Sequence, residues 1–536
     1  MTFAMPFRRF LLLSLLVLTA FALTLPAVAR AQVTAFMQSV AEAAADDRAI
    51  AEFYKESGYK AIWTDRGNRA KQRRQAFLQA VSQAPAHALP AERYNPELLE
   101  ANLRKVRSER DLGRIEVEMS RLFLRYARDI QTGILTPSRV DEGLVREVPL
   151  RSRKATLVAF SKSSPKAFIK ALPPQHPEYT RLMKEKLNFE KLIGRGGWGP
   201  EVQSKTLKPG ATGNGVIQLR NRLIAMGYLK RNASKTYDDN MVQAVARFQR
   251  DHGLFTDGVV GPATMRAINV SAAERLTQII VAMERERWMN MNRGERHIWV
   301  NLTDFTAKVV DNGKVTFQTR SVIGKDIRDR RSPEFSDVME HMVINPSWYV
   351  PRSIATKEYL PLLKENPFAV GNLEIRDVRG QLVNRAAMDF TEFSETNFPF
   401  DMREPPNQGN ALGLVKFMFP NQYNIYLHDT PAKSLFGREK RDFSHGCIRL
   451  ADPFDFAYHL LAKQERDPKG FFQSQLRTGR EITVPLKKQV PVHIVYRTAF
   501  TQAKGNIQFR GDVYERDVKI WRALENAGVA LRAVRG

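Results

Sequence analysis

The only cysteine of this 536-residue chain lies in a short motif that could carry out acyl transfer. Cys447 directly follows Ser444, His445 and Gly446. A cysteine attacks acyl groups as its thiolate, and an unperturbed thiol is only a few per cent ionised near neutral pH, so a nearby imidazole is needed to accept the proton. Glycine permits a tight turn whose successive N–H groups point at one spot and can stabilise a tetrahedral oxyanion. The motif therefore predicts a cysteine nucleophile that acts without a metal.

The residues around this motif favour catalysis over a structural role. A lone cysteine is commonly a small buried hydrophobe, but the preceding Ser-His-Gly makes a nucleophile the better interpretation. Arg449 is close enough in sequence to favour the anionic form of the site. One cysteine can form neither an intramolecular disulfide nor a multi-cysteine zinc site. The other histidines are scattered and no His-Glu-x-x-His is present, so we expect no metal.

Strand patterns surround the motif and would have to position it. Residues 290–490 are enriched in β-branched and aromatic residues, and Asp311-Asn312-Gly313 is a typical hairpin turn. We expect an all-β catalytic domain here, interrupted by an insertion at about residues 352–413. A long insertion beside a site is a candidate lid. Residues 491–536 are expected to form a short C-terminal tail.

Two helical regions precede the strands. Residues 32–200 look mostly helical and end in a glycine-rich linker. Residues 201–275 predict a three-helix unit, with Asp238 or Asp239 as the cap of its second helix and Pro262 at the first position of its third. The stretch AVARFQRDHGLFTDGVVGPAT resembles the peptidoglycan-binding domain type 1. The alternative is a helical spacer without ligand affinity.

The N-terminus and the charge bear on the compartment. Residues 1–31 combine Arg8 and Arg9, an apolar run and a small-residue cleavage site, which predicts a secretory signal peptide. The alternative is an uncleaved anchor, although the apolar run is shorter than the roughly 20 residues that span a bilayer. No later segment has a membrane-spanning apolar run, so we expect an exported protein of the periplasm or cell envelope with no integral span after cleavage.

The net charge is +26, with 83 Lys+Arg against 57 Asp+Glu spread along the chain. Such a balance can indicate nucleic-acid binding, but export argues against that. The charge would instead retain the protein weakly among anionic envelope polymers, or would simply solvate its surface. Nucleic-acid binding would again be a reasonable hypothesis if the mature protein were cytoplasmic and still carried residues 1–31.

The sequence resembles the L,D-transpeptidases of the YkuD type, in particular the large YcbB-like branch. The family signature is a histidine followed after a short interval by [S/T]HGC, and here His428 precedes Ser444 by 16 positions. The runs YNIYLHDTPAKSLF and NPSWYVP also match. The resemblance implies a multidomain α+β protein: a helical scaffold domain, a three-helix peptidoglycan-binding module, and a catalytic domain with an inserted lid.

The resemblance implies a role for each catalytic residue. Cys447 matches the nucleophile, and His428 matches the general base that deprotonates it. His445 matches the motif histidine, with an orienting role. The N–H groups of Gly446 and Cys447 match the oxyanion hole.

The remaining site residues would contact substrate. The resemblance gives Ser444 and Arg449 this role, and it places Tyr426 and Trp348 at the donor pocket. Trp348 is equally consistent with ordinary core packing. No cofactor and no metal are implied.

The implied reaction has two steps on peptidoglycan tetrapeptide stems. Cys447 attacks the carbonyl of the third residue, D-alanine leaves, and the side-chain amine of a second stem resolves the thioester as a 3→3 cross-link. Water as acceptor would make the enzyme an L,D-carboxypeptidase, and a protein amine would attach a protein to the wall. A non-catalytic wall-binding scaffold is a further alternative. The expected partners are donor and acceptor stem peptides and other cell-wall synthesis proteins, with no nucleic acid.

Overall fold

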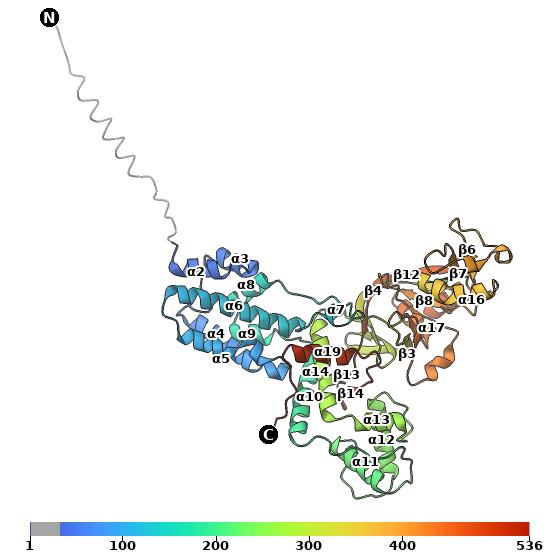
Figure 1. The fold of residues 1–536 in the computed structure, drawn as a ribbon, viewed down its shortest axis with the longest axis horizontal. Helices are drawn as coiled ribbons and strands as arrows, with labels where there is room; N and C mark the ends of the chain where they lie inside the picture. The colour runs from blue at the N-terminus through green and yellow to red at the C-terminus, as the bar shows by residue number, and fades with distance from the viewer. Residues whose placement is uncertain (2–32, 535–536) are drawn as a thin grey trace. The chain divides into compact units, whose positions relative to one another are not determined.

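The computed structural model describes Met1 and residues 33–534 (Figure 1). The predicted signal peptide therefore lies outside the described residues, apart from Met1. Within the described part, no helix is long and apolar enough to cross a membrane.

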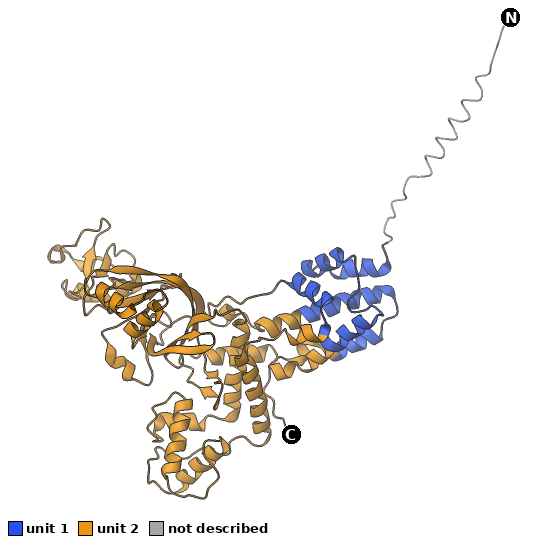
Figure 2. Ribbon diagram, turned by 180° about the vertical axis from the view of Figure 1, so that it is seen from behind, with its two compact units in different colours: residues 1–77, 97–124, 152–165 blue, residues 78–96, 125–151, 166–536 orange. Residues whose placement is uncertain are grey.

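The chain divides into two compact units (Figure 2). Unit 1 comprises residues 1–77, 97–124 and 152–165, and unit 2 comprises residues 78–96, 125–151 and 166–536. The boundaries fall inside four helices, so the expected scaffold domain of residues 32–200 contributes to both units.

Unit 1 is helical and is built around an aromatic core. Trp63, Phe77, Phe123 and Phe160 pack with ring centroids 4.3 to 5.8 Å apart. The buried carboxylate of Glu116 accepts hydrogen bonds from three successive backbone N–H groups, residues 62–64, which fixes the loop that carries Trp63. The helices that lie wholly or partly in this unit are α2 (Ala35–Ala43), α3 (Arg48–Glu56), α4 (Asn68–Ser82), α5 (Pro96–Arg104), α6 (Glu109–Thr132), α8 (Arg153–Lys162) and α9 (Pro165–Lys170).

Unit 2 begins with helices that lead into the sheet-rich part. The long helices α10 and α14 pack against each other. α14 starts with a capping box between Ser271 and Glu274, which satisfies two backbone donors at its first turn. The helical elements of this part are η1 (Ala84–His87), η2 (Ala91–Tyr94), α7 (Pro137–Val140), α10 (Pro177–Gly194), α11 (Asn214–Ala225), α12 (Asp239–Asp251), α13 (Pro262–Asn269) and α14 (Ala272–Trp288).

The three-helix unit predicted at residues 201–275 is present as α11, α12 and α13. Asp238 is the cap of α12, because its side chain accepts a hydrogen bond from the N–H of Met241. Pro262 occupies the first turn of α13. The helices share a small apolar core of their own, which includes Val216, Leu219 and Phe248.

The catalytic-motif region is a nine-stranded sheet with the order β10-β3-β11-β9-β8-β4-β12-β1-β2. β2 also pairs with β3, so the sheet closes on itself. Its strands are β1 (Arg296–Asn301), β2 (Thr306–Asp311), β3 (Lys314–Gly324), β4 (Phe335–Ile344), β8 (Val415–Met418), β9 (Leu427–His428), β10 (Asp442–Ser444), β11 (Ile448–Leu450) and β12 (Ile482–Val495).

Local backbone conformation sets two of the strand boundaries, and two helices that the strand patterns did not indicate join the sheet. Asn312 and Gly313 both have positive φ (49° and 76°), the geometry of a two-residue hairpin turn between β2 and β3. Asn424 has a φ of 53°, which breaks the extended conformation, and β9 begins only at Leu427. α17 (Pro453–Leu461) and α18 (Pro468–Leu476) pack apolar residues into the same core as the strands, so the domain is sheet-rich rather than all-β. The expectation of a multidomain α+β protein is confirmed.

The insertion at residues 352–413 is a folded element with its own core. Its apolar residues include Leu363, Phe390 and Phe398. The N–H of Asn345 donates to the carbonyl of Leu414 (2.9 Å), so the two ends of the insertion leave the sheet side by side. Its elements and the strand before it are β5 (Trp348–Tyr349), α15 (Arg352–Ile354), the π-helix η3 (Ala355–Tyr359), α16 (Leu360–Glu365), β6 (Glu374–Arg376), η4 (Arg385–Ala387), η5 (Phe390–Glu392) and β7 (Asp401–Glu404).

The C-terminal segment folds back into unit 2. Residue 491, where we expected a tail to begin, lies inside β12, and its neighbours pair with β1 and β4. The buried side chains of Tyr496, Tyr514 and Arg516 then fix the following residues within the unit. The remaining elements are η6 (Lys433–Gly437), β13 (Ala499–Phe500), β14 (Gln508–Phe509) and α19 (Arg516–Asn526).

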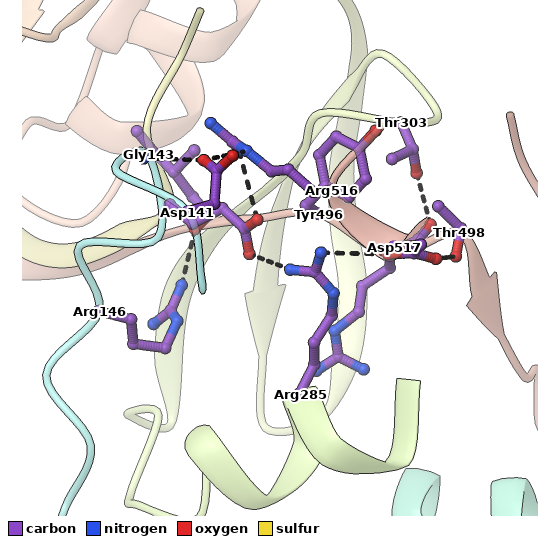
Figure 3. A network of polar contacts seen from close by, with 12 residues as sticks. Asp141, Gly143, Arg146, Arg285, Thr303, Tyr496, Thr498, Arg516 and Asp517 are labelled. Carbon is purple, nitrogen blue, oxygen red and sulfur yellow. Dashed lines mark hydrogen bonds and ion pairs between the residues drawn. The ribbon is translucent and has the colours of Figure 1, made fainter. Parts of the chain in front are cut away.

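Buried ion pairs hold this segment in place (Figure 3). Arg516, which is fully buried, donates to Glu334 (3.3 Å) and lies 3.6 Å from Asp141. Arg285 of α14 pairs with Glu334 and with Asp517 (2.5 and 3.1 Å). The C-terminal segment is thereby joined to α14, to residue 141 and to the segment just before β4.

Candidate active site

The cysteine motif forms a tight turn between β10 and β11. Gly446, with a φ of +116°, adopts a backbone conformation that L-residues rarely take. The hydroxyl of Ser444 accepts from the N–H of Gly446 (3.2 Å) and donates to the carbonyl of Cys447 (2.5 Å). Ser444 is buried and thus fixes the turn from inside.

The expected pair of oxyanion donors is only half available in this arrangement. The N–H of Gly446 donates to the hydroxyl of Ser444 (3.2 Å) in this arrangement, so it would reach a reacting carbonyl only after that bond breaks. The N–H of Cys447 has no hydrogen-bond partner in the described part of the chain. One of the two predicted donors is therefore free.

Cys447 is half-buried, and its thiol contacts the segment that precedes β9. Sγ lies 3.4 Å from the carbonyl of Asn424, to which the thiol donates. The hydroxyl of Tyr426 hydrogen-bonds the same sulfur, and the carbonyl of Tyr426 accepts from Ile448 (3.0 Å). The backbone and the hydroxyl of Tyr426 both act on Sγ of Cys447, and both lower the pKa of the thiol.

His428 lies on the neighbouring parallel strand. Its register partner on β11 is Arg449. The imidazole is buried, its Nδ1 has no hydrogen-bond partner, and its ring lies 5.6 Å from that of Tyr426. The structure therefore brings Cys447, Tyr426, His428 and Arg449 to adjacent positions, with Tyr426 in contact with the thiol and beside the imidazole.

The electrostatics keep both reacting groups neutral. Burial raises the pKa of the Cys447 thiol to about 11, against the opposing effects of Tyr426, Arg449 and Lys416. Burial, and then the nearby charges of Arg449 and Lys416, lower the pKa of His428 to about 3. The expected activation by Arg449 has the right direction, but burial outweighs it. The resting site thus holds a neutral thiol on the turn and an unprotonated imidazole on the neighbouring strand, with Tyr426 in contact with the thiol and 5.6 Å from the imidazole between ring centroids.

The other two predicted residues lie apart from this cluster. His445 is exposed on the turn, and its Nε2 lies 2.8 Å from Glu358 of the insertion. Trp348 is in β5, where it pairs with Glu404 of β7 and packs against the core of the insertion, edge-on to Tyr359 (6.3 Å). Its observed surroundings match the core-packing alternative.

A second set of residues supports the turn and was not visible in the sequence. The buried hydroxyl of Ser332 donates to the carbonyl of Gly446 (2.6 Å) and accepts from the N–H of Gly324 (3.0 Å). Tyr514 and Arg516 of the C-terminal segment hydrogen-bond the backbone of Ser332 (3.3 and 3.0 Å). A serine more than 100 positions before the motif gives no local signal, so only the fold reveals these contacts.

No group of three or more His, Cys, Asp or Glu side chains among the described residues could hold a metal ion. The turn itself offers a thiol, an imidazole on the neighbouring strand and a backbone donor, with the guanidinium of Arg449 and the amine of Lys416 nearby.

Three family profiles match the sequence. Residues 295–488 match YkuD, the "L,D-transpeptidase catalytic domain", residues 212–268 match the "Putative peptidoglycan binding domain", and residues 48–185 match the "Scaffold domain". The resemblance drawn from the cysteine motif is thereby confirmed.

Individual proteins match over parts of the chain. A "Putative L,D-transpeptidase" of Haemophilus influenzae is 29% identical over 255 residues, which is 47% of this chain and 51% of that protein. The N-acetylmuramoyl-L-alanine amidase CwlL of Bacillus licheniformis is 41% identical over 71 residues, 13% of this chain and 20% of its own length. The chain thus spans about half of the first relative and a fifth of the second.

A solved L,D-transpeptidase structure (residues 123–326) from Xylanimonas cellulosilytica is 14% identical, covers 55% of this chain and 98% of its own, and has a TM-score of 0.17.

Proposed function

Because the chain contains an L,D-transpeptidase catalytic domain, a peptidoglycan-binding domain and a scaffold domain, we propose that it forms 3→3 cross-links between peptidoglycan tetrapeptide stems through a Cys447 acyl-enzyme. The observation that carries the proposal is the thiol of Cys447, half-buried at a tight turn and in contact with Tyr426, whose ring lies 5.6 Å from that of His428.

In the first step, the thiol of Cys447 loses its proton to the neutral imidazole of His428 as sulfur attacks the carbonyl of the third stem residue. The amide bond to D-alanine then breaks, and the leaving amine takes the proton back from the imidazole. The product is a thioester between Cys447 and the shortened stem. His428 is unprotonated, which is the form that accepts a proton, but its lowered pKa makes it a weaker base than a free imidazole. The general-base role therefore requires that substrate binding raise the pKa of His428 toward the working pH.

Negative charge develops on the carbonyl oxygen of the stem peptide during attack, and hydrogen-bond donors must stabilise it. The free N–H of Cys447 supplies one, and the N–H of Gly446 becomes a second once the hydroxyl of Ser444 turns away. The cationic side chains of Arg449 and Lys416 add favourable potential, because both stabilise negative charge at Cys447.

In the second step, the side-chain amine of an acceptor stem attacks the thioester carbon. The new amide forms, the carbon–sulfur bond breaks, and the amine's proton returns the sulfur to its thiol form. Water competes with the amine at this step. The folded insertion at residues 352–413 contacts the motif through His445 and Glu358, and we assign it the role of a lid that excludes water and positions the amine.

Peptidoglycan-directed domains are consistent with a cell-envelope location. Export through the predicted signal peptide, Ser444 and Trp348 as substrate contacts, and association with other cell-wall synthesis proteins remain part of this proposal.

Product analysis with purified disaccharide-tetrapeptides tests the reaction. We expect dimers joined 3→3 and free D-alanine from the wild type, and neither from Cys447→Ala or His428→Gln. His341→Gln, a half-buried histidine on β4, is the matched control and should retain activity. Free tripeptides without dimers would instead indicate a carboxypeptidase, stems linked to protein would indicate wall attachment, and an unchanged Cys447→Ala would refute the mechanism.

A further inference from the structure

One carboxylate outside the motif joins the insertion to the cysteine turn. Glu358 lies in the π-helix η3 (Ala355–Tyr359), between α15 and α16. Its Oε1 is 2.8 Å from Nε2 of His445 and 2.7 Å from Nη2 of Arg330. Helical turns of the π type are rare and frequently occur at functional sites.

These three residues come from three different segments. Glu358 belongs to the insertion, Arg330 to the connection between β3 and β4, and His445 to the cysteine turn. Their side chains are about one-third exposed, at 31%, 28% and 35% respectively. Ion pairs with this exposure contribute little to stability, so removing Glu358 should not unfold the protein.

The carboxylate determines which ring nitrogen of His445 carries a proton. An ionised carboxylate only accepts hydrogen bonds, so Nε2 must be the protonated nitrogen in this contact. In the neutral ring, Nδ1 is then left as an acceptor. Glu358 therefore fixes both the orientation of the ring and its tautomer.

The second partner of Glu358 also touches the turn. The carbonyl of Arg330 packs so closely against Gly324 that a Cβ on that glycine would lie 2.0 Å from it and 3.0 Å from Cα of Gly446. The backbone of Arg330 is therefore packed next to the residue that precedes the nucleophile. By binding both Arg330 and His445, Glu358 contacts the turn from two sides.

We propose that Glu358 is a positioning residue, which the insertion carries and which orients His445 and Arg330. The cysteine turn then reaches its reactive geometry only while Glu358 of the insertion contacts these two side chains. The predicted effect on the rate of Cys447 acylation rests on the proposed function, whereas the predicted orientation of the His445 ring does not.

The neighbouring charges do not duplicate this contact. Lys357 and Asp329 approach to 3.7 Å but are each more than half exposed, and Arg331 pairs with Asp326 (2.8 Å). Neither pair includes His445. Among the described residues, the carboxylate paired with His445 is that of Glu358.

The test compares Glu358→Ala, Glu358→Gln and the control Glu365→Ala, an exposed glutamate seven residues farther along the same helical segment. The glutamine keeps an oxygen that can accept from Nε2. We expect Glu358→Ala to slow acylation of Cys447 by about 10-fold, Glu358→Gln to stay within about 3-fold of the wild type, and Glu365→Ala to be unchanged.

A second measurement is independent of catalysis. Nitrogen-15 NMR of the nine histidines, with His445 assigned by a His445→Gln variant, reports its tautomer. We expect the Nε2–H form in the wild type and in Glu358→Gln, and a mixture in Glu358→Ala. If the wild type does not acylate, the proposed function fails while the NMR result still tests the inference. A Glu358→Ala protein with unchanged His445 shifts, or one that acylates as fast as Glu365→Ala, would overturn it.

Discussion

Replacing Ser332 by alanine tests whether the turn around Cys447 depends on support from outside the motif. The substitution removes one hydroxyl that now bonds both the carbonyl of Gly446 and the N–H of Gly324. Both backbone groups belong to buried residues, so water does not readily replace the lost partner. A buried backbone group without a partner costs about 1–3 kcal/mol.

The cost at Gly446 falls on the residue next to the nucleophile. If it is fully expressed in the transition state, about 1–3 kcal/mol corresponds to a roughly 5- to 150-fold slower acylation. The cost at Gly324 adds to the loss of folding stability, so the unfolding temperature should fall by several degrees.

Ser321→Ala is the matched control. Ser321 is also fully buried, on β3, but its hydroxyl has no hydrogen-bond partner in the described part of the chain. The same deletion there should change neither the rate nor the unfolding temperature appreciably. The assay is the second-order rate of Cys447 acylation, followed by intact mass, alongside thermal unfolding. If Ser332→Ala and Ser321→Ala behave alike, support of the turn by Ser332 is refuted.

Three further predictions concern the thiol, the insertion and the C-terminal segment. Because burial raises the pKa of Cys447 to about 11, its alkylation by iodoacetamide should keep rising with pH above 9, and at pH 8 it should be about 100-fold slower than for a thiol of pKa 9; a plateau below pH 9 would contradict this. Replacing residues 352–413 by a short glycine-serine linker should shift products from cross-linked dimers toward hydrolysed tripeptides, and an unchanged ratio would exclude the lid role. Arg516→Ala leaves buried carboxylates without their partner and should cost about 3–5 kcal/mol in thermal unfolding. Arg328→Ala, from an exposed pair, should leave the unfolding temperature nearly unchanged; equal losses in the two variants would contradict this.

The parts of the fold that sequence could predict are those with a local cause. The hairpin turn needs two residues in the left-handed conformation, and Asn312 and Gly313 adopt it readily. Asp and Pro are residue types that favour the start of a helix, as Asp238 and Pro262 do here. The motif of Ser444 to Cys447 likewise carries its own turn, because the serine bonds both neighbours within three residues.

The parts that could not be predicted depend on contacts between distant residues. Nothing near Ser332 or Tyr514 indicates that they meet at the turn, and Trp348 packs into the insertion because β5 pairs with β7 across more than 50 residues. The protonation state of Cys447 was also beyond a sequence argument. Charge spacing suggested an easily ionised thiol, but burial, which only the fold defines, has the larger effect.

The central claim is that Cys447 forms the covalent intermediate. It is tested most directly by the intact mass of the purified protein mixed with a carbapenem-type acyl donor, followed by peptide mapping, with Cys447→Ala in parallel. The account predicts one adduct on the wild type, located on the peptide that contains Cys447, and none on the variant. An adduct that persists in Cys447→Ala, or its absence from a folded wild type, would contradict it.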